Sequence, residues 1–452
     1  MQHRVYTKRW IILALVAALL LASCGPAATP DPSMATDTPA RTPKPTFTPQ
    51  PGEPATPADA GTPTDEGVSA AEATLAPTMT VAAAGPASTD EPTAVPATAT
   101  PSPVKSLRMD SPEYGMQIFP WWRPEVGSRD FQVVAEAGFS WAKVNFGWRE
   151  IEGAGKGVFD WSRTDEIVRM AAENDIDLVI RVDHQPAWAG GGFPVNGPPD
   201  DYQDLADFFT AMATRYRGRV RAYQVWNEPN LAREWGGRLP DPGQYAKLLR
   251  VCYQAIKAAD PNAMVISAGL SPTGTWNEQA RPDDWYLESM YIAMNEALGS
   301  SDGYFDVLGA HAPGFKSPPE RDPAQVAADP DLGGQRAFAF RRVEDLRAIM
   351  VKYGDANKQV AILEFGWTSD PRPDSPYNWH AVSEQVKADY LVRAYQYARD
   401  NWSPWIGLMS LIYICDHDWT PEDEQYWWSI SDPGWPEFKP RPAYTALKQM
   451  AK

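Results

Sequence analysis

The stretch "YQVWNEPN" (Tyr223–Asn230) ends an apolar, strand-like run in an amide, a carboxylate and a proline. A buried strand that stops on Asn227, Glu228 and Pro229 must turn there, because proline lacks a backbone donor and restricts the residue before it. The simplest interpretation is a turn. The alternative is that Glu228 is a functional carboxyl group at the end of a strand, and the remaining sequence must decide between the two.

Seven other short apolar runs resemble this one. Near-continuous apolar strands are typical of a parallel sheet that is buried on both faces. We therefore expect eight strands, at residues 114–119, 141–146, 177–182, 222–226, 264–268, 307–310, 360–363 and 407–412.

The segments between these runs have apolar residues at helical spacing. We expect helices at residues 164–174, 201–216, 245–257, 337–353, 383–399 and 442–450. Alternating strands and helices predict an α/β fold, here a (β/α)8 TIM barrel in residues 105–452. An open doubly wound sheet is the alternative, but no glycine-rich nucleotide loop follows the first predicted strand.

The N-terminus (residues 1–24) has the pattern of a bacterial export signal. Three basic side chains precede an apolar run of 13 residues, Trp10–Ala22, and a membrane-spanning helix needs about 20. The run ends in "LASC", which resembles the lipobox of bacterial lipoproteins and implies that Cys24 is lipidated. An ordinary cleaved signal peptide or an uncleaved helix is the alternative. We expect an exported protein, held at the bacterial cell surface through this lipid anchor only.

Residues 25–104 differ in composition from the rest of the chain. They contain 17 of the 44 prolines and are otherwise mainly Thr, Ala, Ser and acidic residues. Such a segment buries too little apolar surface to offset the entropy lost on ordering. We expect a disordered, extended linker between the anchor and the barrel.

The formal net charge is −17, and the part of the chain beyond residue 104 is also acidic. An acidic surface disfavours nucleic acids and other polyanions as partners. Cys252 and Cys415 fall on different predicted elements, and we interpret them as free buried thiols. We expect a monomer without a cofactor. We also expect no metal site, because the acidic run Asp416–Trp419 lacks the spacing of a calcium loop.

A second strand-end glutamate gives Glu228 a partner. Glu364 ends the seventh predicted strand, in "AILEFGWTS", 136 residues after Glu228. The fourth and seventh strands of a barrel face each other across the mouth where active sites lie. Retaining cleavage of a glycosidic bond needs two such carboxyl groups, about 5–5.5 Å apart, one to protonate the leaving oxygen and one to attack the anomeric carbon. A single strand-end glutamate is usually solvated or a helix cap, so the prediction rests on the pair.

The motifs "VWNEPN" and "ILEFGW" together resemble glycoside hydrolase clan A. The segments "DPGQYAKLLR" (241–250) and "NWHAVSEQVKADYLVRAY" (378–395) are similar to its β-xylosidase and cellulase-like members. The resemblance implies a retaining glycoside hydrolase that acts on a β-linked oligo- or polysaccharide. It also implies that Glu228 is the acid/base, that Glu364 is the nucleophile, and that Asn227 binds the sugar 2-hydroxyl.

Other candidate substrate-binding residues end neighbouring strands. His311 ends the sixth strand, and two residues later clan members carry a tyrosine that hydrogen-bonds the nucleophile, where this chain has Pro313. Tyr413, after the eighth strand, is a candidate replacement. Lys143 lies near the position of an arginine in many clan members, and its alternative is a solvent-facing lysine. For His184, which ends the third strand, the alternative is a structural histidine.

Tryptophans gather at the ends of the predicted strands. A sugar can stack its C–H face on an indole ring, so several together predict an aromatic-lined carbohydrate cleft. Packing at the rim is the alternative for any single one. We expect Trp188 and Trp367 to be the main platforms, among the set Trp121, Trp122, Trp148, Trp188, Trp367, Trp419, Trp427 and Trp428.

Two other functions stay open. A barrel that has lost catalysis but still binds carbohydrate is favoured by Pro313, and the presence of both glutamates argues against it. A purely structural lipoprotein would leave two opposed strand-end glutamates without an explanation.

Overall fold

The computed structural model describes residues 106–121 and 123–452. The predicted signal sequence with Cys24, the predicted linker and Trp122 lie outside the described residues. Within the described ranges, no helix is both long and apolar enough to span a membrane. Because Cys24 lies outside the described residues, the lipid anchor stays a prediction.

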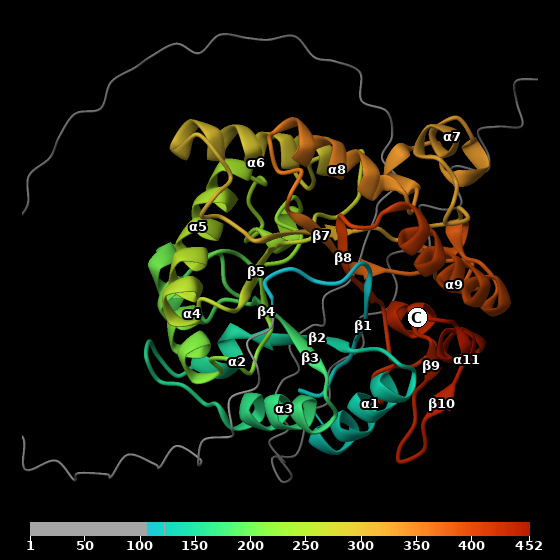
Figure 1. Cartoon of the computed structure of the whole chain (residues 1–452), viewed down its shortest axis with the longest axis horizontal. Helices are drawn as coiled ribbons and strands as arrows, with labels where there is room; N and C mark the ends of the chain where they lie inside the picture. The colour runs from blue at the N-terminus through green and yellow to red at the C-terminus, as the bar shows by residue number, and fades with distance from the viewer. Residues whose placement is uncertain (1–105, 122) are drawn as a thin grey trace, which may run out of the picture. The chain divides into compact units, whose positions relative to one another are not determined.

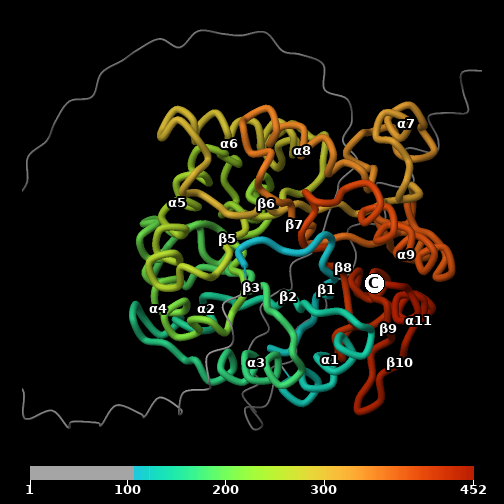
Figure 2. The backbone as a smooth tube through the Cα atoms, in the orientation of Figure 1, coloured from blue at the N-terminus to red at the C-terminus, as the bar shows by residue number. Residues whose placement is uncertain are grey.

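Eight parallel strands form a closed barrel in sequence order, and β8 pairs back with β1, so these two strands lie side by side (Figure 2). The predicted (β/α)8 barrel is confirmed, and every predicted strand end lies within two residues of the observed one. The strands are β1 (Glu113–Gln117), β2 (Trp141–Gly147), β3 (Asp177–Asp183), β4 (Ala222–Val225), β5 (Met264–Ser267), β6 (Val307–His311), β7 (Gln359–Phe365) and β8 (Ile406–Leu411).

Helices surround the barrel (Figure 1). They are α1 (Pro124–Glu136), α2 (Trp148–Glu152), α3 (Ser162–Glu173), α4 (Tyr202–Arg215), α5 (Pro242–Ala259), α6 (Asp283–Leu298), α7 (Pro323–Ala327), α8 (Arg342–Lys352), α9 (Glu384–Asn401), α10 (Glu424–Trp428) and α11 (Pro442–Gln449). Short 3-10 turns are η1 (Ala187–Ala189), η2 (Ala232–Glu234), η3 (Pro330–Leu332), η4 (Arg336–Phe338) and η5 (Asn378–His380). The sequence did not predict the two long helices α1 and α6 or the short helices α2, α7 and α10, and the helix expected from residue 337 begins only at Arg342. A small antiparallel ribbon, β9 (Ser431–Asp432) with β10 (Lys439–Pro440), precedes α11.

An apolar layer fills the inside of the barrel. It consists of Met109, Trp141, Val179, Ala222, Met264, Ile266, Val307, Ala361, Leu363 and Leu408. Side chains two residues apart on a strand share a face, so Lys143 and Arg181 lie on the inner side of β2 and β3, one step beyond this layer. Both are almost completely buried, at 1% exposure. The barrel interior therefore changes from apolar to charged toward the carboxyl ends of the strands.

The register of β6 and β7 shifts at the site. Ala310 pairs with Ile362, but the next residue, His311, pairs with Glu364, so one residue of β7 is skipped. Bulges of this kind re-aim side chains beside active sites. Here the shift pairs His311 with Glu364, so the imidazole lies next to the carboxylate on the neighbouring strand.

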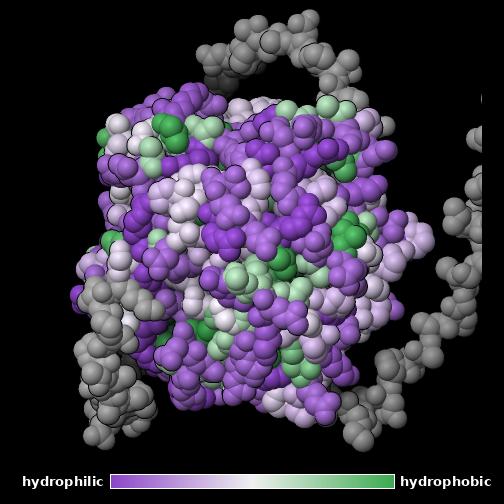
Figure 3. Space-filling model, turned by 45° about the vertical axis from the view of Figure 1, so that its right-hand side comes forward, coloured by the Kyte–Doolittle hydropathy of each residue, from purple (hydrophilic) through white to green (hydrophobic). Residues whose placement is uncertain are grey.

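The surface view in Figure 3 is mainly hydrophilic, with apolar residues scattered over it. The free cysteines Cys252 and Cys415 are both buried, as predicted. Most of the apolar side chains lie inside the barrel or between the barrel and its helices.

Candidate active site

Glu228 lies just beyond β4 on a tight turn of the backbone. Trp226 and Glu228 have φ angles of 69° and 37°, a region that residues other than glycine rarely adopt. Packing holds this conformation: the buried indole of Trp226 donates to the carbonyl of Glu234, and the Glu228 N–H donates to the carbonyl of Gly269 at 3.1 Å. Such backbone strain is concentrated at functional sites. The "NEP" stretch is thus a turn that also fixes a buried carboxyl group.

The Glu228 carboxylate is 2% exposed and has two cationic or potentially cationic partners. Its Oε1 lies 3.0 Å from His311 Nδ1, and its Oε2 accepts a hydrogen bond from Arg233 at 2.9 Å. Burial alone would raise the pKa of Glu228, but the His311 hydrogen bond and the Arg233 charge outweigh it and lower the pKa below its usual value. Unliganded Glu228 therefore favours the ionised form.

Glu364 lies on β7 and is 6% exposed. Its Oε1 accepts a hydrogen bond from Lys143 Nζ at 2.6 Å and lies 3.5 Å from Arg181 Nη1. Burial would raise the pKa of Glu364, but Lys143, His311 and Arg181 together lower it to about 2. Glu364 is therefore a carboxylate at any ordinary pH.

Lys143 reaches Glu364 from β2 through the inside of the barrel. Burial lowers the pKa of Lys143 to about 8, and the adjacent carboxylate of Glu364 opposes that shift. Its Nζ also donates to Gln117 Oε1 at 3.2 Å. At neutral pH the lysine and the glutamate thus form a buried ion pair, in which each charge compensates the burial of the other.

His311 stands between the two glutamates. Its Nδ1 contacts Glu228, and its Nε2 lies 3.9 Å from Glu364 Oε1. The ring fits because position 269 is a glycine: a Cβ there would lie 2.1 Å from the imidazole. One buried side chain on β6 therefore lies between the two carboxyl groups, and the role of His311 in substrate binding stays a prediction.

A second row of polar groups lies next to this centre, and sequence reasoning missed two of its members, Arg181 and Asp183. Arg181 on β3 donates to Asp183 at 2.7 Å, and Asp183 lies 2.6 Å from His184 Nδ1. Burial opposes ionisation of both groups, but the nearby charges raise the pKa of Arg181 and lower that of Asp183. The signal was present in "DLVIRV", where one arginine interrupts an apolar strand. His184 is thus tied to the site through Asp183 and Arg181.

Comparison with known proteins agrees with this geometry. The family model for cellulase, glycosyl hydrolase family 5, matches residues 100–295, a range that includes Glu228 but ends before Glu364. A β-xylosidase from Geobacillus stearothermophilus is 30% identical over 183 residues, which is 37% of this chain and 33% of the relative. The chain thus spans about a third of the length of that curated relative.

Solved structures share the fold at lower identity. A family 39 glycoside hydrolase from Bacteroides cellulosilyticus WH2 is 20% identical with a TM-score of 0.54, covering 75% of this chain and 64% of its own. A glucosidase from Croceicoccus marinus is 14% identical with a TM-score of 0.53, covering 77% and 68%. Together these findings support a clan A glycoside hydrolase. The resemblance predicted from the two glutamate motifs is confirmed at this level.

Asn227 and Tyr413 lie at the mouth of the barrel. Asn227 is 3% exposed, and its Oδ1 is 3.5 Å from Gln224 Nε2. Tyr413 is 4% exposed, and burial and the nearby Glu364 charge raise its pKa well above the usual value, so its hydroxyl stays neutral. The side chains that contact the Glu364 carboxylate come instead from β2, β3 and β6. Lys143 makes the shortest of these contacts, at 2.6 Å, to the carboxyl group whose orienting partner the sequence left open at Pro313.

The position of Trp367 contradicts the prediction that its ring stacks on a sugar. The side chain is 0% exposed, its indole N–H donates to the carbonyl of Ser317 at 2.9 Å, and it packs against Phe340 and Tyr390. A Cβ at Gly314 would lie 1.9 Å from the ring. A ring enclosed on all sides has no face for a ligand, so Trp367 is part of the core.

The other strand-end tryptophans mostly pack into the protein as well. Trp188 is half-buried on η1, where its indole donates to the carbonyl of Glu152 at 2.7 Å and its ring meets Trp148 edge-on. Trp419 is 5% exposed and packs with Phe119 and Tyr413. Five of the expected tryptophans are therefore buried, namely Trp121, Trp148, Trp367, Trp419 and Trp428, whereas Trp188 and Trp427 are half-buried and stay candidates for contact with a sugar.

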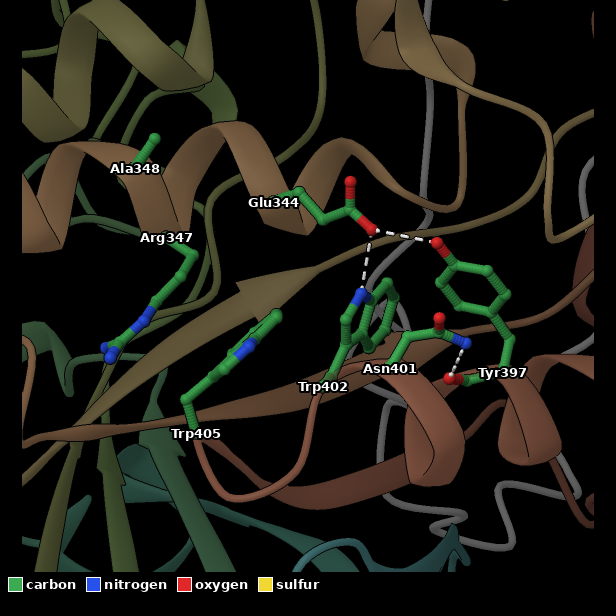
Figure 4. A pocket seen from close by; sticks show the side chains of 7 residues that line it. All are labelled: Glu344, Arg347, Ala348, Tyr397, Asn401, Trp402 and Trp405. Carbon is green, nitrogen blue, oxygen red and sulfur yellow. Dashed lines mark hydrogen bonds between the residues drawn. The ribbon is translucent and has the colours of Figure 1, made fainter.

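A shallow hollow lies away from these glutamates, between α8 and α9 (Figure 4). Its floor is structural, because Glu344 accepts hydrogen bonds from Trp402 at 2.8 Å and Tyr397 at 3.3 Å. Arg347 donates to backbone carbonyls, including that of Lys358 at 2.8 Å. Its polar groups thus bind α8 to α9 through Glu344, and to the segment before β7 through Arg347.

In the part of the chain that the structure describes, no group of three or more His, Cys, Asp or Glu side chains is arranged to hold a metal ion. In the acidic run after β8, Asp416 accepts from the backbone N–H of Asp418 at 3.0 Å, and Asp418 pairs with Arg123 at 2.9 Å. These contacts account for the run as a folded loop.

Proposed function

We propose that this chain hydrolyses β-linked glycosidic bonds with retention of configuration, with Glu364 as the nucleophile and Glu228 as the acid/base. The observation that supports this most is the pair of buried carboxyl groups at one imidazole: His311 lies 3.0 Å from Glu228 and 3.9 Å from Glu364. The names of the relatives, cellulase and β-xylosidase, favour a β-linked oligo- or polysaccharide as the substrate.

Glu364 has the protonation state and the geometry of a nucleophile. With a pKa of about 2 it is ionised before any substrate arrives. The contacts from Lys143, Arg181 and His311 all go to Oε1. The other oxygen, Oε2, is therefore the one that can attack the anomeric carbon while Oε1 stays anchored.

The reaction has two steps in this arrangement. In the first, Glu364 Oε2 bonds to the anomeric carbon, the glycosidic C–O bond breaks, and the proton of Glu228 passes to the leaving oxygen. In the second, Glu228 takes a proton from water, the water oxygen bonds to the anomeric carbon, and the ester to Glu364 breaks. Both glutamates return to their starting states.

The low pKa of Glu228 sets the pH range of this cycle. The first step needs protonated Glu228, and Arg233 and His311 favour its ionised form. The second step needs the carboxylate, which the same two neighbours stabilise. We therefore expect turnover to be fastest at acidic pH and to fall as the pH rises.

A carbohydrate-binding barrel without turnover is the second candidate. It is favoured by the 2.9 Å contact between Arg233 and Glu228, which holds the proposed acid in its ionised form. Pro313 favours this second candidate less than the sequence alone suggested, because Lys143 and Arg181 contact Glu364 in place of a tyrosine.

The test uses the full chain with aryl β-glycosides and with xylan, β-glucan and mannan. NMR of the first-formed sugar is expected to show the β-anomer, and an α-anomer as first product would exclude the retaining mechanism. Azide is expected to rescue Glu364→Ala as an α-glycosyl azide and Glu228→Ala as a β-glycosyl azide. Binding of these polysaccharides without turnover of any substrate would support the second candidate instead.

We also propose that the chain is exported and anchored to the cell surface through a lipid on Cys24, as the "LASC" sequence indicates. Metabolic labelling with a fatty-acid analogue is expected to label the wild type and not Cys24→Ala. Labelling of both proteins to the same extent would exclude this anchor.

A further inference from the structure

Two large aromatic side chains are exposed next to each other near the mouth of the barrel. Trp276 is 54% exposed and Trp285 is 37% exposed, and their ring centroids are 4.6 Å apart at an interplanar angle of 70°. Trp276 lies on the loop between β5 and α6, and Trp285 lies in the first turn of α6. Both therefore belong to the face that contains the carboxyl ends of the strands.

The exposed ring of Trp276 is held in place rather than loose. The Arg281 guanidinium lies 5.0 Å from its ring centroid, and the same group donates to the carbonyls of Asn277 and Ala280. An arginine fixed on one face and an indole against the edge limit the rotation of the ring. An indole ring that is exposed and held in one orientation can stack on a ligand.

The loop that bears Trp276 is bonded to the segment that follows Glu228. Asn230 donates to the carbonyl of Ser271 at 2.9 Å and to that of Arg281 at 3.0 Å. The backbone N–H of Ala232 donates to the carbonyl of Gln279 at 2.8 Å. A β-bridge joins Leu231 to Ala280. The aromatic pair is thus connected to the side of the site where Glu228 would protonate the leaving group.

We propose that Trp276 and Trp285 form a sugar-binding platform, which holds the leaving-group part of a neutral β-linked polysaccharide chain. A neutral polymer fits because the chain has a formal net charge of −17, which disfavours polyanions, and because indole rings accept the C–H faces of sugars. This inference rests on the proposed function, since it takes Glu228 as the group that faces the leaving oxygen. It adds that the enzyme acts on chains longer than a single glycosyl unit.

The test compares the double variant Trp276→Ala/Trp285→Ala with Trp435→Ala. Trp435 is a matched control, because it is 44% exposed and also has an arginine, Arg129, 5.8 Å from its ring, but lies between β9 and β10. The double variant is expected to raise KM on the polysaccharide that the wild type hydrolyses by about tenfold. Its kcat/KM on an aryl β-glycoside is expected to stay within about twofold, because that substrate does not reach the platform. Equal losses on both substrates, or no loss on the polymer, would overturn the proposal.

Retardation of the folded proteins in native gels that contain xylan, β-glucan or mannan gives a readout that does not need catalysis. Retardation of the wild type and the control, but not of the double variant, supports the platform even if no substrate is hydrolysed, and in that case the proposed function fails alone. Hydrolysis of polysaccharide with equal retardation of all three proteins overturns the platform and leaves the proposed function intact.

Discussion

The two carboxyl groups at the barrel mouth are held in different ways. Glu364 lies on β7, and side chains from three other strands contact its Oε1: Lys143, Arg181 and His311. Glu228 lies on the loop after β4 and shares His311, but its second partner is Arg233, five residues further along the same loop. The Glu364 carboxylate is thus held by the barrel alone, and the Glu228 carboxylate by one partner from the barrel and one from a local loop.

The cation that pairs with Glu364 is also more deeply buried than the cation that pairs with Glu228. The Lys143 side chain is 1% exposed, whereas the Arg233 side chain is 31% exposed. Charges interact more strongly where water is excluded, and removing one partner of a buried pair leaves the other uncompensated. The barrel therefore holds Glu364 ionised, whereas the pKa of Glu228 depends on His311 from the barrel and on the more exposed Arg233 from the loop, where a substitution costs less.

The largest effect is expected from the glutamates themselves, and the leaving group should separate their roles. Glu364→Ala is expected to lose hydrolysis of every aryl glycoside, because no nucleophile is left. Glu228→Ala is expected to lose about 10²- to 10⁴-fold in kcat/KM on substrates with poor leaving groups and little on a dinitrophenyl glycoside, which needs no proton. Steady-state kinetics over a series of substituted phenols measures this. Equal losses for both variants over the whole series would refute the assigned roles.

Lys143→Met is expected to lower kcat on the order of 100-fold or more. Without this cation, burial raises the pKa of Glu364 and reduces the fraction of ionised nucleophile. The unfolding free energy should also fall, by about 3 kcal/mol, because a buried pair is broken. Kinetics and denaturant unfolding measure the two effects. Lys143→Arg is the control that keeps the charge, and a Met variant with unchanged kcat would show that Lys143 does not orient the nucleophile.

Arg233→Met is expected to move the pH profile. The guanidinium lowers the pKa of Glu228, so its removal raises that pKa, and the basic limb of the kcat/KM profile should shift upward by about one pH unit. The acidic limb, set by Glu364, should stay where it is. Arg238→Met in the same loop is the control for a lost surface charge. An unshifted basic limb would mean that another group is the acid.

The smallest effect is expected from Tyr413→Phe. Glu364 is already held by Lys143 and Arg181, so loss of the Tyr413 hydroxyl is expected to lower kcat by less than about fivefold, the loss of one neutral hydrogen bond. A loss comparable to that of Lys143→Met would instead give Tyr413 the orienting role that the sequence left open. Thermal unfolding of the variant checks that the ring still packs with Phe119 and Trp419.

The strands were predictable because each is a short apolar run bounded by polar turn residues. Period and composition alone locate such elements. The helix α6 was missed because its sequence, "DDWYLESMYIAMNEAL", is apolar on several sides, and it bears both exposed Trp285 and buried Tyr291. Helical periodicity identifies a helix with one buried stripe and is weak for a helix without one.

The tryptophans show where sequence position misleads. Trp367 and Trp188 follow strand ends and were expected to face a sugar, yet Trp367 is completely buried. Trp276 and Trp285, on the β5–α6 loop and the start of α6, form the exposed pair instead. A tryptophan at a strand end can turn inward or outward, and packing of the neighbouring loops decides which.

By itself, the sequence determined the eight strands, their order, and the presence of two glutamates at the ends of the fourth and seventh. These features depend on local composition and on the topology rule that parallel strands end at one face. Only the tertiary structure decided which charges meet. The inward side of β2 depends on register, since a shift of one residue would turn Lys143 away from Glu364. The choice of Lys143, Arg181 and His311 as the partners of Glu364 therefore came from closure of the barrel, which brings β2, β3, β6 and β7 around one point.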